Sequence, residues 1–201
     1  MSKSLATWFT PSLQTISRSA GRSAVAAAAY RACVKLIDQT TGLIHDYTKK
    51  KGHVETILIG ADDISELWNK AELAETRKNS TVARELMLPL PDQWTDNERR
   101  ECVRDIAQHL RDTYGVAAAG SIHAANRHDR NGHCHLMFTT RVVDDDGNFG
   151  KKTRILDDMK TGEVKRLREA ICKIINDHAE KLGSDFYVYA GKFSDIDKNH
   201  I

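Results

Sequence analysis

Four of the nine histidines lie within one short segment of the chain, and their spacing could hold a metal ion. His133 and His135 stand two positions apart and precede the β-prone run from Leu136 to Thr140. On a strand, residues two apart point to the same face, because successive side chains alternate. His123 ends the preceding predicted strand and could sit on a neighbouring position of that face. Three neutral imidazoles there would bind a divalent transition metal and leave other positions open for water or substrate.

The alternative is a set of surface histidines around a polar loop, and the spacing alone leaves both interpretations open. The segment from Asn126 to Gly132 contains several turn formers, so His128 is expected to face solvent. Cys134 lies between the paired histidines and should therefore point to the opposite face of the strand. We expect it to be a buried core thiol and not a ligand.

Tyr30 is the candidate nucleophile. It ends a run rich in alanine that starts at Gly21, with Arg22 and Arg31 near the two ends. Small side chains let a ligand approach closely, and arginine suits phosphate. A phenol with a pKa of about 10 is a weak nucleophile. It needs an activated electrophile, such as a phosphoryl group polarised by a metal ion. A lone helical tyrosine is otherwise a core or rim residue, and nothing in the sequence shows that Tyr30 meets the histidines.

The net charge of +2, from 30 basic and 28 acidic side chains, says little about nucleic acid, so local clusters must carry that argument. Three basic clusters stand out: Lys49-Lys50-Lys51, Lys151-Lys152 with Arg154, and Lys165-Arg166 with Arg168. The first two follow predicted hairpin strands and are candidates for a groove that tracks a phosphate backbone. The third lies on a predicted helix and is expected to be a solvated face.

The elements that must position these residues alternate between strands and helices. Strands are predicted at 5–10, 34–37, 43–47, 54–59, 82–88, 116–123, 133–142 and 186–189. Helices are predicted at 23–31, around 67–74, from the capping-box pattern at 95–98 to 114, and along a stripe formed by Leu167, Ile171, Ile174, Ile175, His178 and Leu182. Thr41-Gly42 and Asp146-Gly147 indicate hairpins, which excludes an all-parallel sheet. We expect an α+β fold with a central, mainly antiparallel five-stranded sheet and helices packed on it.

Length and composition favour a single domain over residues 1–201, without repeats or low-complexity linkers. No apolar run approaches the roughly 20 residues of a membrane span, so no membrane insertion is expected. The first twenty residues show no secretory signal. Four scattered cysteines without a Cys-x-x-Cys pair fit a reducing cytoplasm better than a disulfide framework.

Taken in order, several segments resemble the MobA/MobL relaxases, the Q class of mobilisation enzymes in the His-hydrophobic-His endonuclease superfamily. The resemblance covers about residues 17–178. It rests on Ser17-Arg18 with Gly21 to Ala26 and Ala29-Tyr30-Arg31, Thr41-Gly42 with His45-Asp46-Tyr47, Leu67-Trp68-Asn69, Ala83 to Leu86 with Leu88-Pro89, the His123…Asn131-x-His133-x-His135 signature, Thr139-Thr140-Arg141 and Gly150-Lys151-Lys152. Two departures are Gly132, where the family often has proline, and the loosely matching segment from Phe186 to Ile201.

The resemblance implies a plasmid-encoded bacterial enzyme that nicks single-stranded DNA at an origin of transfer. Tyr30 would attack the scissile phosphate, giving a 5′-phosphotyrosyl link and a free 3′ hydroxyl, and the same site would later rejoin the strand. His123, His133 and His135 would hold one divalent cation, Mn²⁺ or Mg²⁺. Glu85 would orient a histidine or accept the tyrosine proton, whereas its alternative is a strand-surface salt bridge with Arg84.

The resemblance also implies DNA contacts and partners. The candidate DNA contacts are Arg22, Arg31, Lys49, Lys50, Lys51, Arg141, Lys151, Lys152 and Arg154. Relaxosome accessory proteins and a type IV secretion coupling protein are expected as partners. Because family members commonly continue into further domains, residues 1–201 are expected to be either a small relaxase or the nicking domain of a longer protein.

Three other functions are compatible with parts of the pattern. A rolling-circle replication initiator shares the histidines and the tyrosine, but its tyrosine usually follows the histidines, whereas Tyr30 precedes them. A DNA-binding or autoregulatory module would bind DNA without cleaving it. A metal hydrolase would use the three histidines on a small substrate and would not depend on Tyr30.

Overall fold

The structure is a computed structural model that describes residues 7–8, 13–125 and 132–191. It comprises two compact units, one formed by residues 13–154 and the other by residues 155–191 with the short strand at 7–8. The histidines, Tyr30 and Glu85 all belong to the first unit. The predicted loop position of His128 lies outside the described residues.

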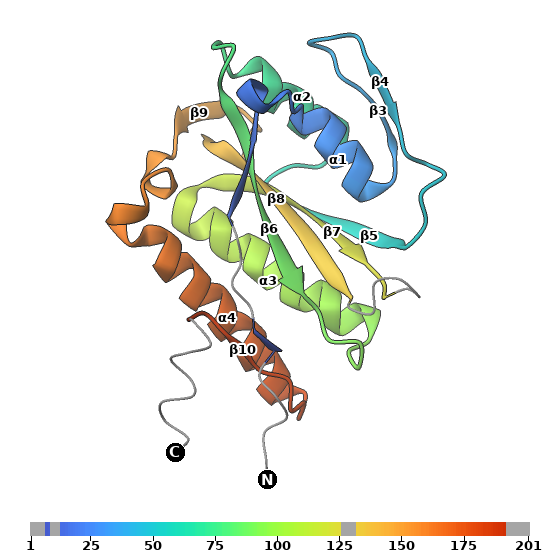
Figure 1. Cartoon of the computed structure of the whole chain (residues 1–201), viewed down its shortest axis with the longest axis vertical. Helices are drawn as coiled ribbons and strands as arrows, with labels where there is room; N and C mark the ends of the chain where they lie inside the picture. Colours follow the sequence, from blue (N-terminus) through green and yellow to red (C-terminus); the bar gives the residue numbers. More distant parts are fainter. Residues whose placement is uncertain (1–6, 9–12, 126–131, 192–201) are drawn as a thin grey trace. The chain divides into compact units, whose positions relative to one another are not determined.

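The first unit is built on an antiparallel sheet (Figure 1). Its strands run in the order β2 (Gln14–Ser17), β6 (Thr81–Pro89), β8 (His133–Val143), β7 (Val116–His123) and β5 (His53–Ile59), and β9 (Phe149–Lys152) adds a sixth strand by pairing with β8. These pairings confirm the predicted α+β class and the mainly antiparallel sheet. The sheet has six strands and not the expected five, because β9 pairs with the end of β8. The two central strands, β8 and β7, carry the His-x-His pair and His123.

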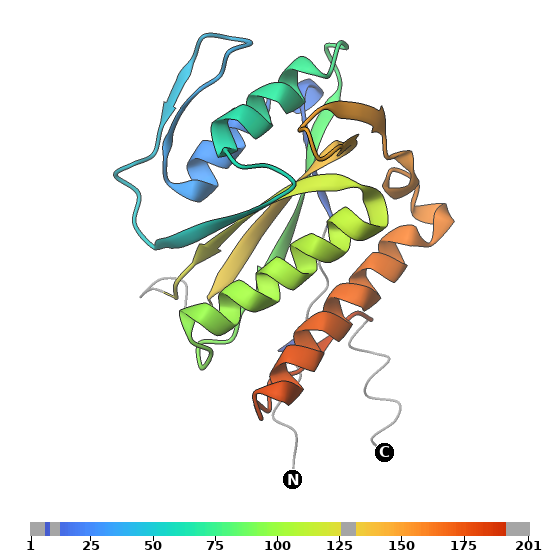
Figure 2. The same ribbon diagram turned by 180° about the vertical axis from the view of Figure 1, so that it is seen from behind.

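Helices cover both faces of this sheet (Figures 1 and 2). On one face lie α1 (Ala24–Ala32) and α2 (Ile64–Leu73). The chain between them forms the hairpin of β3 (Lys35–Ile37) and β4 (Ile44–Asp46) and then β5. On the other face lies α3 (Asp96–Tyr114), whose predicted capping box is present between Thr95 and Glu98. Because side chains alternate along a strand, odd-numbered residues of β7 and β8 face α1 and even-numbered residues face α3.

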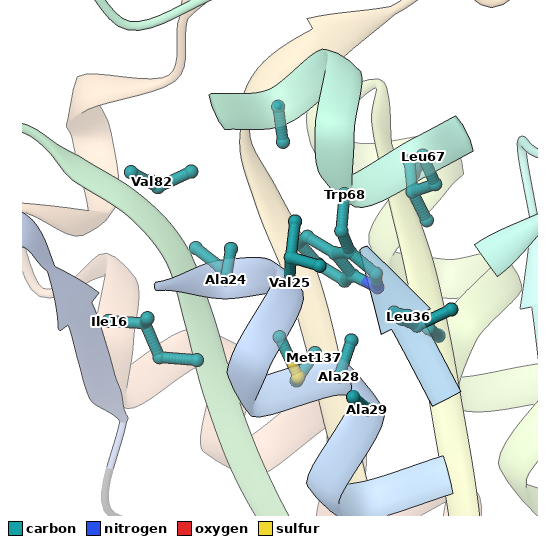
Figure 3. Close-up of a cluster of buried hydrophobic side chains, with 14 of the residues drawn as sticks. Ile16, Ala24, Val25, Ala28, Ala29, Leu36, Leu67, Trp68, Val82 and Met137 are labelled. Atoms are coloured by element: carbon teal, nitrogen blue, oxygen red, sulfur yellow. The ribbon is translucent and has the colours of Figure 1, made fainter. Parts of the chain in front are cut away.

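Small side chains bring α1 close to the sheet. Ala24, Ala28 and Ala29 are buried in a cluster with Trp68 of α2 and Met137 of β8, which Figure 3 shows at close range. Alanine adds no bulk at these positions, so the helix axis can approach the strands closely, and alanine is also the strongest helix former. The hydroxyl of Ser23 caps the helix by accepting from the amide of Ala26 at 3.2 Å. The sequence of α1 thus specifies both the helix and its position.

The second unit contains α4 (Glu163–Lys181) and a parallel pair of short strands, β1 (Thr7–Trp8) and β10 (Val188–Tyr189). The short 3-10 helices are η1 (Arg18–Ala20) in the first unit, η3 (Met159–Thr161) in the second, and η2 (Arg154–Leu156) at their boundary. The predicted buried stripe of α4 is correct at Leu167, Ile171 and Ile175 and wrong at Leu182. Leu182 is exposed because the helix ends there. In the described part of the chain, no helix is long and apolar enough to cross a membrane.

Candidate active site

Three histidines meet on the face of the sheet that α1 covers. His123 pairs directly with His133 across β7 and β8, and His135 lies two residues further along β8, opposite Ser121. The ring centroids are 5.4 Å apart for His123 and His133, 5.5 Å for His123 and His135, and 5.1 Å for His133 and His135. The structure therefore brings together the three residues that their spacing singled out. Cys134 points to the opposite face and is fully buried, as predicted.

Glu85 of β6 holds His135 in place. Its carboxylate accepts a hydrogen bond from Nδ1 of His135 at 2.8 Å, which leaves Nε2 of that ring to face the cluster. Arg31 donates to both oxygens of the same carboxylate. Burial raises the pKa of Glu85, but the hydrogen bonds from His135 and Arg31 outweigh it and lower the pKa to about 2. The alternative of a surface salt bridge with Arg84 is wrong, because Glu85 is buried and Arg84 donates to the carbonyl oxygen of Thr153.

His123 is held by the end of α1. Its Nε2 lies 2.8 Å from the carbonyl oxygen of Arg31. Burial lowers the pKa of His123 to about 4, so the ring is neutral near pH 7. An imidazole must be neutral to bind a metal ion. The same contact places the residue that follows Tyr30 directly on the histidine cluster.

Three imidazoles are suitable ligands for one divalent cation, but their rings are not oriented toward a common point. As they lie, the rings of His123 and His133 are parallel within 8°, and Nε2 of His123 is engaged with Arg31. No three histidine, cysteine or acidic side chains of the described residues converge on one point. A shared ion would require the rings to turn, since Nε2 of His123 is engaged with the carbonyl oxygen of Arg31. The bond between Glu85 and His135 has the form of the carboxylate–histidine pairs that orient metal ligands.

Tyr30 lies at the exposed end of α1, beside the cluster. Its side chain is 46% exposed and packs edge-on against Tyr47, with ring centroids 5.2 Å apart. Nζ of Lys50 lies 3.7 Å from the centre of the Tyr30 ring and 3.3 Å from the Tyr30 carbonyl oxygen. The alternative of a buried core tyrosine is therefore wrong. The Lys50 ammonium over the ring is a cation–π contact, which holds a positive charge beside the tyrosine.

Of the predicted DNA contacts, the structure brings one group to this end of the sheet. Lys50 touches Tyr30, and Lys49 and Lys51 are exposed on either side of it. Arg22 is exposed just before the start of α1. Arg31 also lies at this end of the sheet, and its guanidinium group donates to Glu85 and to the carbonyl oxygen of Ala27.

The other group lies at the far end of β8. Arg141 is six residues beyond His135, about 20 Å along an extended strand. It pairs with Glu75, as does Lys152, whose Nζ also donates to the carbonyl oxygen of Thr81 at 2.7 Å. Lys151 and Arg154 are exposed at this same end. The structure therefore does not bring Arg141 or the cluster from Lys151 to Arg154 next to the histidines.

A fourth histidine beside the cluster was missed at the level of sequence. His53 pairs with His123 in the register of β5 and β7, and their ring centroids lie 5.7 Å apart. Its Nε2 is 2.9 Å from Oγ1 of Thr56, which in turn is 3.0 Å from Oγ of Ser121. In the sequence His53 directly precedes the predicted strand at 54–59, and only the pairing of β5 with β7 shows that it lies beside His123.

The fold and the site together define the class: an α+β protein whose central sheet carries a histidine cluster, beside a helix with an exposed tyrosine in its last turn. The comparisons with known proteins then give the family. Residues 22–196 match the MobA/MobL family, and the chain belongs to it.

The relatives carry names from plasmid mobilisation and conjugation. The chain is 39% identical over 173 residues to Mobilization protein MobL of Acidithiobacillus ferridurans, covering 73% of this chain and 46% of that protein. It is 31% identical over 166 residues to Conjugal transfer protein TraA of Agrobacterium fabrum, covering 72% of this chain and 14% of that protein. The chain thus spans about half of the MobL protein and a small part of TraA.

A solved structure shares the fold. It is described as "Molecular Basis of Vancomycin Resistance Transfer in Staphylococcus aureus", and it matches with a TM-score of 0.77 at 26% sequence identity. The match covers 92% of this chain and all of the other.

Proposed function

We propose that this chain is the nicking domain of a Q-class mobilisation relaxase, which cleaves one strand of DNA at an origin of transfer. The observation that carries the proposal is the contact between the end of α1 and the histidine cluster, through His123 and the carbonyl oxygen of Arg31. Because Tyr30 directly precedes Arg31, this contact supports a role for the exposed tyrosine together with the three imidazoles. Family membership and the names of the relatives support the same function.

In the proposed reaction, the hydroxyl oxygen of Tyr30 attacks the phosphorus of the scissile phosphodiester. A bond forms between that oxygen and phosphorus, and the bond from phosphorus to the 3′ oxygen breaks. The phenol proton leaves to solvent, which reaches the half-exposed side chain, and the 3′ oxygen takes a proton from water. The products are a 5′-phosphotyrosyl protein and a free 3′ hydroxyl, and reversal of the same step rejoins the strand.

His123, His133 and His135 would hold one Mn²⁺ or Mg²⁺ ion, which when bound would polarise a non-bridging oxygen of the scissile phosphate. The role of Glu85 is to orient His135, because both of its oxygens are already engaged with His135 and Arg31. Arg31 in turn keeps Glu85 ionised. Lys50 neutralises charge at Tyr30 and on the phosphate that approaches it.

The test is a cleavage assay on end-labelled single-stranded oligonucleotides that tile both strands of the origin region of the replicon carrying this gene. Wild type and Tyr30→Phe are compared with Mn²⁺ and with EDTA, and Tyr187→Phe serves as the control that removes an exposed tyrosine hydroxyl elsewhere. We expect a metal-dependent product with protein attached to its 5′ end, formed by wild type and Tyr187→Phe and absent from Tyr30→Phe.

Two outcomes would contradict the proposal. Cleavage that survives Tyr30→Phe would indicate attack by water at the histidines, as in a metal hydrolase. Binding without any covalent product over the whole set would indicate the non-catalytic DNA-binding module. Accessory proteins that open the duplex, a type IV secretion coupling protein and a cytoplasmic location belong to the same proposal, because they follow from a relaxase role.

A further inference from the structure

A cavity of about 450 Å³ lies between the start of α1 and the turn of the β3–β4 hairpin. Its walls are mostly apolar and come from Gly21, Ala26, Leu43 and the aliphatic parts of Thr40 and Thr41, with His45 to one side. Cavities of this size accept small organic ligands. None of its lining residues belongs to the histidine cluster, so it is a separate feature.

The cavity and the proposed nucleophile lie along one strip of the molecule. Ala26 and Tyr30 are four residues apart on α1 and therefore share one face of the helix. His45 and Tyr47 are two residues apart and point the same way from the hairpin. His45 lines the cavity with Ala26, and Tyr47 packs on Tyr30. The distance along the helix from the first pair to the second is about one turn, roughly 6 Å.

The charges at the cavity favour an anionic ligand. Two carboxylates line it, but both are satisfied within the protein. Asp38 accepts from Oγ of Ser23 at 2.7 Å, and Glu72 pairs with Arg18. Arg22 and Lys78 are exposed at the mouth, and within the described residues neither side chain forms an ion pair.

His45 adds an unmet hydrogen-bonding group. Its Nε2 is withdrawn from solvent and has no hydrogen-bond partner among the described residues. A buried polar atom of this kind is stabilised when a ligand supplies the missing partner. The cavity thus offers apolar walls and two free cations at its mouth, and one of its lining residues, His45, has an unsatisfied polar atom beneath the surface.

We propose that this cavity is a nucleotide subsite that takes one unstacked base of the single-stranded DNA, a few nucleotides from the bond that Tyr30 cleaves. The base enters between Ala26 and Leu43, where its edge reaches His45, and the flanking phosphates lie against Arg22 and Lys78. Apolar contact with a base and cations along the backbone are the two means by which proteins hold single strands. The inference rests on the proposed function, because it names how that function selects its strand.

The test couples a change in the protein to a change in the DNA. All proteins carry Tyr30→Phe, so that binding is measured without cleavage, by fluorescence anisotropy on the origin oligonucleotide that binds most tightly. Ala26→Leu fills the cavity with a strong helix former and leaves the charges unchanged. Each nucleotide of the oligonucleotide is replaced in turn by an abasic unit. Arg22→Gln and Lys78→Gln test the phosphate contacts, and Arg77→Gln, at an exposed position that does not line the cavity, is the control.

We expect Ala26→Leu to weaken binding of the intact strand about tenfold, the value of one lost base contact. One abasic position should weaken binding by the protein with the unfilled cavity by the same factor. On that oligonucleotide, Ala26→Leu should weaken binding no further. Arg22→Gln and Lys78→Gln should weaken binding and lower its salt dependence, and Arg77→Gln should do neither.

Unchanged binding by Ala26→Leu, or an equal loss on every oligonucleotide whichever base is missing, would overturn the subsite. Circular dichroism and thermal unfolding of Ala26→Leu show whether α1 remains folded. Coupling at one position without any covalent product in the cleavage assay would refute the nuclease and keep the subsite. Cleavage without such coupling would support the nuclease and refute the subsite.

Discussion

Arg31 shows how far a residue's role depends on a partner that lies distant in sequence. Its position next to Tyr30 predicts a phosphate contact, because arginine suits phosphate geometry. In the structure its guanidinium group instead forms a two-point pair with Glu85, which is 54 residues further along the chain. The pair buries a carboxylate beside His135 and keeps it ionised. Composition and local spacing contain no signal for that pairing, since it exists only once α1 and β6 are placed.

The first prediction concerns this pair. Glu85→Gln keeps the shape of the side chain but removes the charge that orients His135 and compensates Arg31. If the three histidines bind Mn²⁺, its affinity should fall 10- to 100-fold, as is usual when such an orienting partner is lost. Isothermal titration calorimetry measures this directly, without any DNA.

Glu55→Gln is the matched control, because Glu55 is paired with Arg100 and does not contact the cluster. It should bind Mn²⁺ as wild type does. Equal Mn²⁺ affinity of Glu85→Gln and wild type would show that Glu85 does not position His135.

A second prediction at this scale concerns pH. Burial raises the pKa of Glu75, but hydrogen bonds from Arg141 and Lys152 outweigh it, so the pKa lies below its usual value. A carboxyl group with a lowered pKa stabilises the fold fully above its unfolded pKa of about 4.3, and the stabilisation is lost as pH falls through the folded value. Glu75→Gln should therefore melt lower than wild type at pH 7, and the difference in Tm should shrink below about pH 4.

Differential scanning fluorimetry between pH 7 and pH 3 measures both proteins. Glu66→Gln removes an exposed carboxylate that pairs with Lys70 on α2, and it should change Tm little at any pH. A difference for Glu75→Gln that stays constant down to pH 3 would contradict the expected pKa.

At the scale of elements, the sequence predicts most of the helices and strands and misses β2 and β9. β2 was not predicted because polar and apolar residues alternate too weakly along Gln14 to Ser17, where only Ile16 is fully buried. It is an edge strand, and its place beside β6 follows from the sheet and not from its own composition. The predicted helices are correct where apolar periodicity coincides with a cap, as at Thr95 and Glu98. The order of the strands could not be predicted, since it depends on contacts between segments far apart in the chain.

The packing of α3 on the sheet gives a third prediction. A Cβ atom on Gly120 of β7 would lie 2.7 Å from Cγ1 of Val103, which is fully buried. Gly120→Ala should therefore destabilise the protein by about 1–3 kcal/mol, the usual cost of overpacking. Val103→Ala should destabilise it separately by leaving a cavity. The double variant should be more stable than the sum of the two effects allows, because the new methyl group occupies the space that valine leaves.

Urea unfolding of the four proteins gives the coupling free energy. Cys172→Ala, in α4 of the other unit, replaces Val103→Ala in a second cycle and should show no coupling to Gly120→Ala. Additive effects of Gly120→Ala and Val103→Ala would show that α3 can move away from β7 at no cost.

At the scale of the whole molecule, charge is balanced, and binding to DNA must depend on where the basic side chains are. The net charge is +2, yet exposed Lys49 and Lys51 flank the residue that touches Tyr30. The fold separates this cluster from Lys151 and Lys152 at the far end of β8, which the sequence presents as an equal candidate. Only the direction of β8 distinguishes them, because it carries His133 at one end and Arg141 at the other.

The last prediction follows from that separation. For a single strand, the logarithm of the binding constant falls with the logarithm of salt concentration, with a slope of about −0.7 per neutralised phosphate. In the Tyr30→Phe background, replacing Lys49 and Lys51 together by glutamine should weaken binding and reduce the slope by up to about 1.4, since two contacts are lost. Replacing Lys165 and Lys173 together removes the same charge from α4, where both are already paired with acidic residues, and should leave the slope unchanged. If the two double variants lose the same slope, binding follows net charge and not the cluster beside Tyr30.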